Sequence, residues 1–285
     1  MRSIYADNAA TTPLDPRVLE AMMPYLTTKY GNAESLNTLG MEAKKALDES
    51  RATLAKFINA ENQEIIFTGS ATEANNMVLK CHAFQQGVNK VHIAISTIEH
   101  PCIHNPASWL KKNGSSITFI PVDSEGLLDF EYLEKVLKAG VTLVSVIHGN
   151  NEIGTIQDIK KIGKLCHEHD AYFHTDAAQT FGKIPIDVKT MNIDIMTMNA
   201  HKTYGPKGVG ALYLNKDVKM EPYLHGGEHE FGLRAGTHNI PGVVGFAKTV
   251  DLREKEMFEE AKKLTILRDR LIKGVLEIDE TYLNG

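Results

Sequence analysis

The sequence predicts an α/β fold built on a mostly parallel sheet. Short apolar runs of strand type alternate along the chain with longer amphipathic runs of helical type. Strands separated by helices of about 10–15 residues require crossover connections, which set successive strands parallel in one sheet. The 285 residues are enough for one large α/β domain, or for one domain with part of a second. Since ligands of such sheets bind beyond the carboxyl ends of the strands, we expect the functional residues there.

The spacing of the apolar residues sets the expected elements. Helical spacing covers residues 34–57, 72–86, 101–112, 130–138, 156–168 and 250–276. Short continuous apolar runs predict strands over 64–68, 91–96, 117–122, 141–148, 172–175, 194–198 and 211–214. The last residues, 282–285, contain an Asn-Gly turn signal and have the character of a strand or hairpin without its partner.

Composition narrows the class of protein. The 42% hydrophobic and 24% charged residues are typical of a globular protein, and the net charge of −5 argues against nucleic acid as a direct partner. No apolar run approaches the roughly 20 residues of a membrane-spanning helix, and the first residues lack the apolar core of a signal peptide. The three cysteines are odd in number and widely spaced, as is usual in a reducing compartment. We therefore expect a cytoplasmic protein that binds no membrane.

Lys202 stands where a reactive amine would be placed. It follows the apolar run 194–198, and a glycine-rich turn, 205–210, comes after it. Burial behind a strand end disfavours the charged ammonium and leaves a nucleophilic amine that can form a Schiff base with an aldehyde cofactor. The alternative is a solvated lysine in a hairpin loop, and this short motif alone does not decide between the two.

A candidate anion site follows the strand at 64–68. Small residues open the next helix, where free backbone N–H groups and the helix dipole favour a phosphate. The hydroxyls of Ser70 and Thr72 add donors. Simple capping of the helix by either hydroxyl is the competing interpretation, and it is compatible with anion binding.

Further polar side chains follow other strands. Asp176 ends an apolar run, and it can either cap a helix or pair with a protonated pyridine nitrogen. His100 can stack on a flat ring or move protons, and Asn151 can donate hydrogen bonds to a ligand. Together with Lys202 and the anion site, these groups describe a site for pyridoxal 5'-phosphate.

The segment 225–237 raises the question of a metal. His225 and His229 lie among two glutamates, but no third ligand is seen to converge with them, so we predict no metal. Arg234 and Thr237 in the same segment are better interpreted as ligands of an anionic oxygen.

The motifs in combination resemble the class V, fold-type I pyridoxal-phosphate enzymes, and within them the cysteine desulfurases of the NifS/IscS type. The resemblance runs from Tyr5 to the last residue and rests on the segments 5–13, 31–32, 70–76, 99–100, 150–154, 176–179, 201–208 and 234–237. It implies a large cofactor-binding domain whose mostly parallel sheet is sandwiched by helices. The implied division is an N-terminal arm at 1–14, the large domain at 15–255, and the start of an incomplete small C-terminal domain at 256–285.

The resemblance also implies residue roles around the cofactor ring. Lys202 would hold the cofactor covalently and later move protons. His100 would stack on the pyridine ring and assist proton transfer. Asp176 would pair with the ring nitrogen, Gln179 with the phenolic oxygen, and Asn151 would lie near the substrate.

A second group would bind the phosphate. The resemblance assigns this role to Ala71, Thr72 and His201, joined by Thr237 from the other subunit of a homodimer. Asn199 stands where the family often has serine, and its amide can still donate to the phosphate.

The implied reaction converts L-cysteine to alanine and leaves persulfide sulfur for iron–sulfur cluster assembly or tRNA thiolation. An iron–sulfur scaffold or another sulfur-acceptor protein would be the partner. The family carries its sulfur-accepting cysteine and a substrate-binding arginine in a further C-terminal segment. Cys81, Cys102 and Cys166 match no catalytic position, so we expect buried, inert thiols and little activity from this chain alone.

Two alternatives remain open at this point. One is another class V enzyme, such as a selenocysteine lyase or an aminotransferase, and the other is a scaffold subunit that binds the cofactor without turnover. One further departure is Asn37, which stands where the family frequently has histidine.

Overall fold

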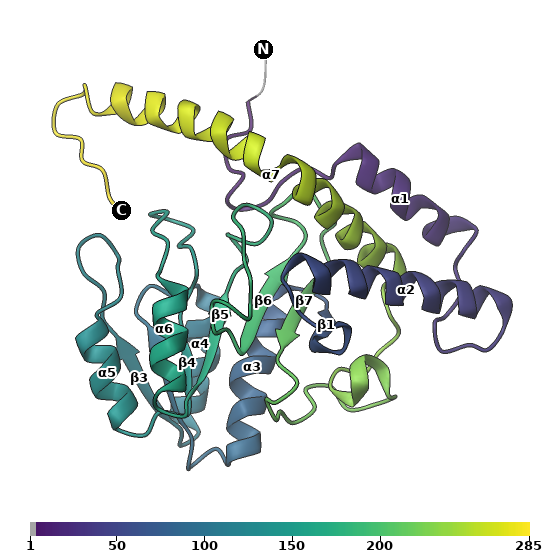
Figure 1. Ribbon diagram of the computed structural model, residues 1–285, viewed down its shortest axis with the longest axis horizontal. Helices are drawn as coiled ribbons and strands as arrows, with labels where there is room; N and C mark the ends of the chain where they lie inside the picture. Colours follow the sequence, from purple (N-terminus) through teal and green to yellow (C-terminus); the bar gives the residue numbers. More distant parts are fainter. Residues whose placement is uncertain (1–3) are drawn as a thin grey trace.

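A computed structural model describes residues 4–285 and shows one seven-stranded sheet with helices packed on it (Figure 1). The strand order is β1-β7-β6-β5-β4-β2-β3. The strands are β1 (Ile65–Thr68), β2 (His92–Ser96), β3 (Ser116–Ile120), β4 (Leu143–Ser145), β5 (Tyr172–Asp176), β6 (Ile195–Asn199) and β7 (Gly210–Leu214). Only β7 runs against its neighbours, β1 and β6, and the pairs among β2 to β6 are parallel. The predicted mostly parallel sheet is confirmed.

The helices lie on both faces of the sheet. They are α1 (Pro16–Thr27), α2 (Thr38–Phe57), α3 (Ala71–Gln86), α4 (Pro101–Lys112), α5 (Phe130–Lys138), α6 (Ile159–His167) and α7 (Ile240–Val275). Strand β7 shows how the two cores divide. Ala211 and Tyr213 belong to the core that contains residues of α2, α5, α6 and α7, whereas Leu212 and Leu214 belong to the core that contains residues of α3. This alternation is expected of a strand covered on both faces.

Several predicted boundaries were wrong for identifiable reasons. Helix α2 begins at Thr38 rather than at residue 34, because the Asn37 side chain caps it by accepting a hydrogen bond from Gly40 N–H. That cap gives Asn37 a structural role. Helix α1 was not predicted, although Asp15 at its N-cap and Pro16 at its first turn are ordinary start signals.

The C-terminal part of the chain differs more from the predicted elements than the rest does. Helix α7 starts at Ile240, ten residues before the predicted start at residue 250, and it is 36 residues long. Gly245 lies inside this helix, and a Cβ there would lie 2.7 Å from Met22 Sδ, so the glycine permits α1 to pack against α7. Residues 282–285 form no strand among the described residues, since no described segment pairs with them.

The C-terminal half of helix α7 extends away from the rest of the protein. The last buried residue of the helix is Met257, and Figure 1 shows the yellow half of the helix extending beyond the sheet. The predicted boundary between residues 255 and 256 falls inside this continuous helix, so the division into domains stays a prediction. The first three residues of the predicted arm at 1–14 lie outside the described residues. No helix among residues 4–285 has both the length and the apolar composition needed to cross a membrane.

Candidate functional site

One cavity of about 220 Å³ opens at the carboxyl edge of the sheet. Because β1, β2, β4, β5 and β6 all end at this edge, the residues that follow them converge. The lining residues are Ala10, Ser70, Ala71, Thr72, His100, Cys102, Ile147, Asn151, Asp176, Ala178, Gln179, Asn199, His201 and Lys202. The cavity thus brings together every residue predicted to bind the cofactor except Thr237.

Lys202 lies half-buried at this cavity, three residues after β6 ends. Its backbone N–H donates to Asn199 Oδ1 at 3.3 Å, which ties the loop back to the strand end. Burial lowers the pKa of the Lys202 ammonium, and the nearby Asp176 carboxylate opposes part of that effect. Within residues 4–285 no carboxylate comes within ion-pair distance of the Lys202 amine. The position therefore favours a nucleophilic amine over the solvated hairpin lysine.

The start of α3 lines the same cavity as that amine and is suited to an anion. Ser70 caps the helix, with its hydroxyl accepting from Glu73 N–H at 3.1 Å. Within the described chain, the backbone N–H groups of Ala71 and Thr72 have no hydrogen-bond acceptor. Gly210 permits β7 to lie close to Ser70, because a Cβ at Gly210 would lie 2.8 Å from the Ser70 carbonyl carbon. Capping by Ser70 therefore leaves these two N–H groups free to bind an anion.

Asp176 ends β5 with only 2% of its surface exposed. Its Oδ2 accepts from Asn75 Nδ2 at 2.7 Å, and its Oδ1 accepts from Ala178 N–H at 2.8 Å. A turn rather than an α-helix follows it, so capping of a helix does not explain this residue. A buried carboxylate facing the cavity suits a cationic partner, such as a protonated ring nitrogen. Asn75, which orients it, was not singled out by the sequence.

Cys102 is an unexpected member of the residues that line the cavity. The neighbouring His100 caps α4, and its Nδ1 accepts from Cys102 N–H at 3.2 Å and lies 2.9 Å from Cys102 Sγ. A neutral imidazole that accepts at Nδ1 carries its proton on Nε2. Burial raises the pKa of the Cys102 thiol to about 12. Its expected burial and inertness are supported, but its place beside His100 was not predicted.

Gln179 and Asn151 line the cavity with their amides already engaged. Gln179 Nε2 donates to Ala9 carbonyl oxygen at 2.8 Å, and Asn151 Nδ2 donates to Glu152 Oε1 at 2.8 Å. Lys183 Nζ donates to Gln179 Oε1. Burial, together with the nearby Lys202 charge, lowers the pKa of Lys183 to about 8. Each amide nitrogen keeps a second N–H that can donate to a ligand in the cavity.

Two residues predicted to bind an anion lie elsewhere. Thr237 is exposed and borders a separate cavity of about 100 Å³ that Arg234 also lines. The Arg234 guanidinium donates to Glu73 at 2.7 Å and so supports the first turn of α3 from outside. Within a single chain, neither side chain reaches the cavity that holds Lys202.

The residues at the cavity fit pyridoxal phosphate. Free N–H groups at a helix start suit the phosphate, the weakly basic amine of Lys202 suits the aldehyde, and the buried Asp176 suits the ring nitrogen. His201 and Asn199 also line the cavity, and His201 Nδ1 lies 3.1 Å from Thr11 Oγ1.

Comparison with known proteins places the whole chain in one group. The family described as Aminotransferase class-V matches residues 4–285. A protein named cysteine desulfurase IscS from Dictyoglomus turgidum is 46% identical over 285 residues, which are 100% of this chain and 72% of that protein. One of the same name from Methanosarcina thermophila is 44% identical over 284 residues, covering 100% of this chain and 70% of that protein.

Solved structures agree with this placement. A structure described as a NifS-like protein has a TM-score of 0.96 and 37% identity, covering 100% of this chain and 78% of its own. Another, described as SspA in complex with cysteine, has a TM-score of 0.84 and 38% identity, covering 87% of this chain and 72% of its own.

Proposed function

The chain belongs to the class-V aminotransferase family, and we propose that it is a cysteine desulfurase that converts L-cysteine to alanine. Its cofactor is pyridoxal 5'-phosphate. The observation that carries the proposal is the convergence of Lys202, Asp176 and the start of α3 on one cavity. The relatives named as desulfurases, and the related structure described in complex with cysteine, support the choice of substrate.

We propose a role for each of the main residues at the cavity. When bound, the cofactor supplies an electron sink that weakens the bonds at the substrate α-carbon. We assign the covalent link and the proton transfers to the Lys202 amine, and we assign to Asp176 the proton held on the ring nitrogen. We assign to His100 the role of covering the ring and assisting the proton transfers. The N–H groups of Ala71 and Thr72 would bind the phosphate.

The thiol that accepts sulfur is proposed to lie outside these residues. All three cysteines are free and buried. Burial raises the pKa of both Cys81 and Cys102 to about 12, and it raises the pKa of Cys166 as well. Since the thiolate is the nucleophile, none of them suits attack on a substrate. The further proposal is a cytoplasmic protein that passes persulfide sulfur to an iron–sulfur scaffold or another acceptor.

Turnover tests this function. The 285-residue chain, loaded with cofactor and given L-cysteine with dithiothreitol to reduce any persulfide to sulfide, is expected to release little or no sulfide and alanine, because it offers no mobile thiolate. Fusing to it the part of the Dictyoglomus turgidum protein outside the matched region should produce both products. The fusion should keep its rate when Cys81, Cys102 and Cys166 are all changed to alanine. 3-Mercaptopyruvate without sulfide would instead support an aminotransferase, because exchange of the amino group leaves the carbon–sulfur bond intact. Rapid turnover by the unfused chain, abolished by one of these cysteine changes, would refute the assignment of the thiol.

We also propose a homodimer in which Thr237 of one subunit reaches the phosphate bound by the other. The exposed position of Thr237, away from its own cavity, is what this arrangement requires. Thr237→Ala is expected to weaken cofactor binding by roughly tenfold or more, since a hydrogen bond to a charged group is lost, whereas Thr237→Ser should bind normally.

Mixing variants tests the sharing of sites. A Lys202→Ala chain combined with a Thr237→Ala chain should give heterodimers with one intact site and one doubly defective site. Half of the sites in such a heterodimer should then hold the cofactor at the parent affinity. A chain that sediments as a monomer at every concentration, yet binds the cofactor with full affinity, would disprove the shared site.

A further inference from the structure

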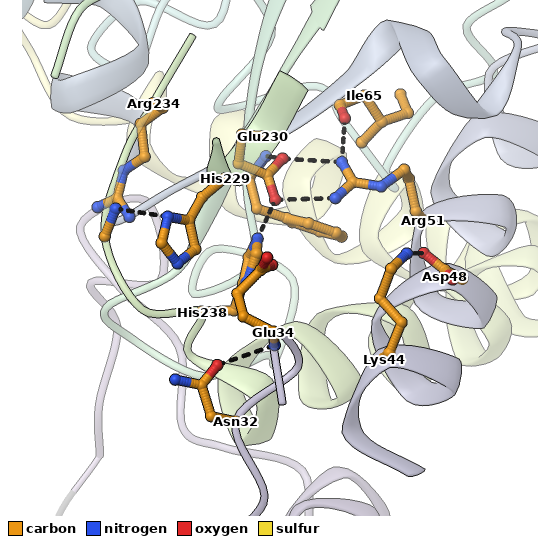
Figure 2. A network of polar contacts seen from close by, with 12 residues as sticks. Asn32, Glu34, Lys44, Asp48, Arg51, Ile65, His229, Glu230, Arg234 and His238 are labelled. Atoms are coloured by element: carbon orange, nitrogen blue, oxygen red, sulfur yellow. Dashed lines mark hydrogen bonds and ion pairs between the residues drawn. The ribbon is translucent and has the colours of Figure 1, made fainter. Parts of the chain in front are cut away.

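Three potential metal ligands from distant parts of the chain meet beside the loop that precedes α2 (Figure 2). Glu34 belongs to that loop, whereas His229 and His238 belong to the segment between β7 and α7. One ligand atom from each residue lies within 4.8 Å of the other two. The cluster is separate from the cofactor cavity, and none of its members lines that cavity.

One ring nitrogen of His238 is buried without a hydrogen-bond partner within residues 4–285, which indicates a bound ligand. Its side chain is only 6% exposed, and its Nε2 lies 2.8 Å from Glu230 Oε1. Its Nδ1 is buried and has no hydrogen-bond partner among the described residues. A buried polar atom without a partner is rare and costs free energy, so a bound group at Nδ1 is the natural explanation.

Glu230 fixes which nitrogen of His238 is free. Its carboxylate accepts two hydrogen bonds of 2.8 Å from Arg51 and one of 2.7 Å from Phe67 N–H. A carboxylate with these donors acts as an acceptor, so the proton of His238 lies on Nε2 and the lone pair on Nδ1. An imidazole that donates its second N–H to a carboxylate is the usual arrangement of metal-binding histidines.

His229 and Glu34 complete the cluster from the exposed side. The two imidazole rings lie 5.1 Å apart between centroids, and Asn32 Oδ1 accepts from Glu34 N–H at 3.0 Å. Gly236 N–H donates to His229 Nδ1 at 3.4 Å, a long contact that is given up when the imidazole proton moves to Nδ1. His229 Nε2 is then available as a ligand.

We propose that Glu34, His229 and His238 bind one divalent cation of the zinc type. Two imidazoles and one carboxylate are a donor set that zinc takes, with a fourth position left for water. Ligand atoms around such an ion are about 3.3 Å apart, so the exposed Glu34 side chain needs only a small movement to reach it. The proposal does not depend on the desulfurase assignment. The ion would tie the loop before α2 to the segment that carries Thr237.

This site was excluded at the level of sequence because no third ligand converged with His225 and His229. The fold supplies Glu34 as that ligand and replaces His225 by His238. His225 is exposed, lies in the same segment and takes no part in the cluster. It is therefore a matched control for the test.

The experiment uses the untagged 285-residue chain after treatment with a chelator. Co²⁺ is titrated in and followed by its visible absorption, Zn²⁺ is then added as a competitor, and thermal unfolding is measured with and without Zn²⁺. We expect one tetrahedral Co²⁺ per chain, displaced by Zn²⁺, and a higher unfolding temperature with Zn²⁺ present.

Variants locate the ion. Glu34→Gln and His238→Ala should each weaken binding by more than the roughly 10- to 100-fold loss caused by changing an outer partner of a metal ligand. His225→Ala should bind as the parent does. Glu34 is exposed, so Glu34→Gln decides the question even if His238→Ala does not fold. The absence of tetrahedral Co²⁺ bands, or parent affinity in Glu34→Gln, would overturn the proposal.

Discussion

Replacing Lys202 by alanine is expected to abolish both the covalent attachment of the cofactor and the turnover of the fused enzyme. The amine is half-buried at the cavity, its pKa is lowered by burial, and no carboxylate among residues 4–285 is paired with it. It would both bind the aldehyde and move protons, so its loss should cost more than the roughly 10²- to 10⁴-fold attributed to a general acid–base group alone.

The measurement combines absorption and peptide mapping. The parent protein with cofactor should be yellow, and borohydride should fix the cofactor to the peptide that contains Lys202. Lys207→Ala is the matched control, because Lys207 is exposed in the same loop. Cofactor label on Lys207, or an unchanged spectrum in Lys202→Ala, would contradict the assignment.

The pH dependence of loading follows from the same pKa. The neutral amine is the reactive form, and it predominates above the pKa of Lys202, which lies below the ordinary lysine value of 10.5. The rate of covalent attachment should therefore rise with pH and level off below pH 10.5. Lys202 thus differs from an exposed lysine, for which the rise would continue to about that pH.

Most of the cofactor cavity was predictable because nearly all of its residues lie at the end of a strand or soon after it. A parallel sheet brings the ends of its strands to one edge, so His100, Asp176 and Lys202 meet although they are far apart in sequence. The apolar runs located the strands to within a few residues. Local pattern and global topology agree here, and this agreement makes the inference possible.

The remaining features depend on packing that no local pattern contains. Cys102 reaches the cavity wall only because His100 caps α4 and the first turn of that helix faces Asp176. Glu34 meets His238 because the loop before α2 and the segment before α7 lie side by side (Figure 2). The close contact of Gly245 with α1 likewise cannot be seen in the sequence of α7.

Glu230→Gln is expected to destabilise the protein by about 3–5 kcal/mol, the usual cost of removing one partner of a buried ion pair. Glu230 and Arg51 have side chains that are 2% and 7% exposed. Besides pairing with Glu230, the Arg51 guanidinium donates to Ile65 carbonyl oxygen and lies over the rings of Phe67 and Phe231. It has no route to solvent when its carboxylate is neutralised, so the penalty of an unpaired buried charge remains in the folded state.

Urea unfolding of the chelator-treated chain measures this cost apart from any metal effect. Glu256→Gln is the control, because Glu256 makes a comparable two-bond contact with Arg17, but those side chains are 44% and 50% exposed. A surface pair of this kind contributes about 0–1 kcal/mol, so its loss should barely shift the unfolding midpoint. The double variant Arg51→Met with Glu230→Leu should recover much of the lost stability, since apolar side chains of similar volume can replace a buried pair. Equal effects of the Glu230 and Glu256 changes would show that burial does not set the strength of the Arg51–Glu230 pair.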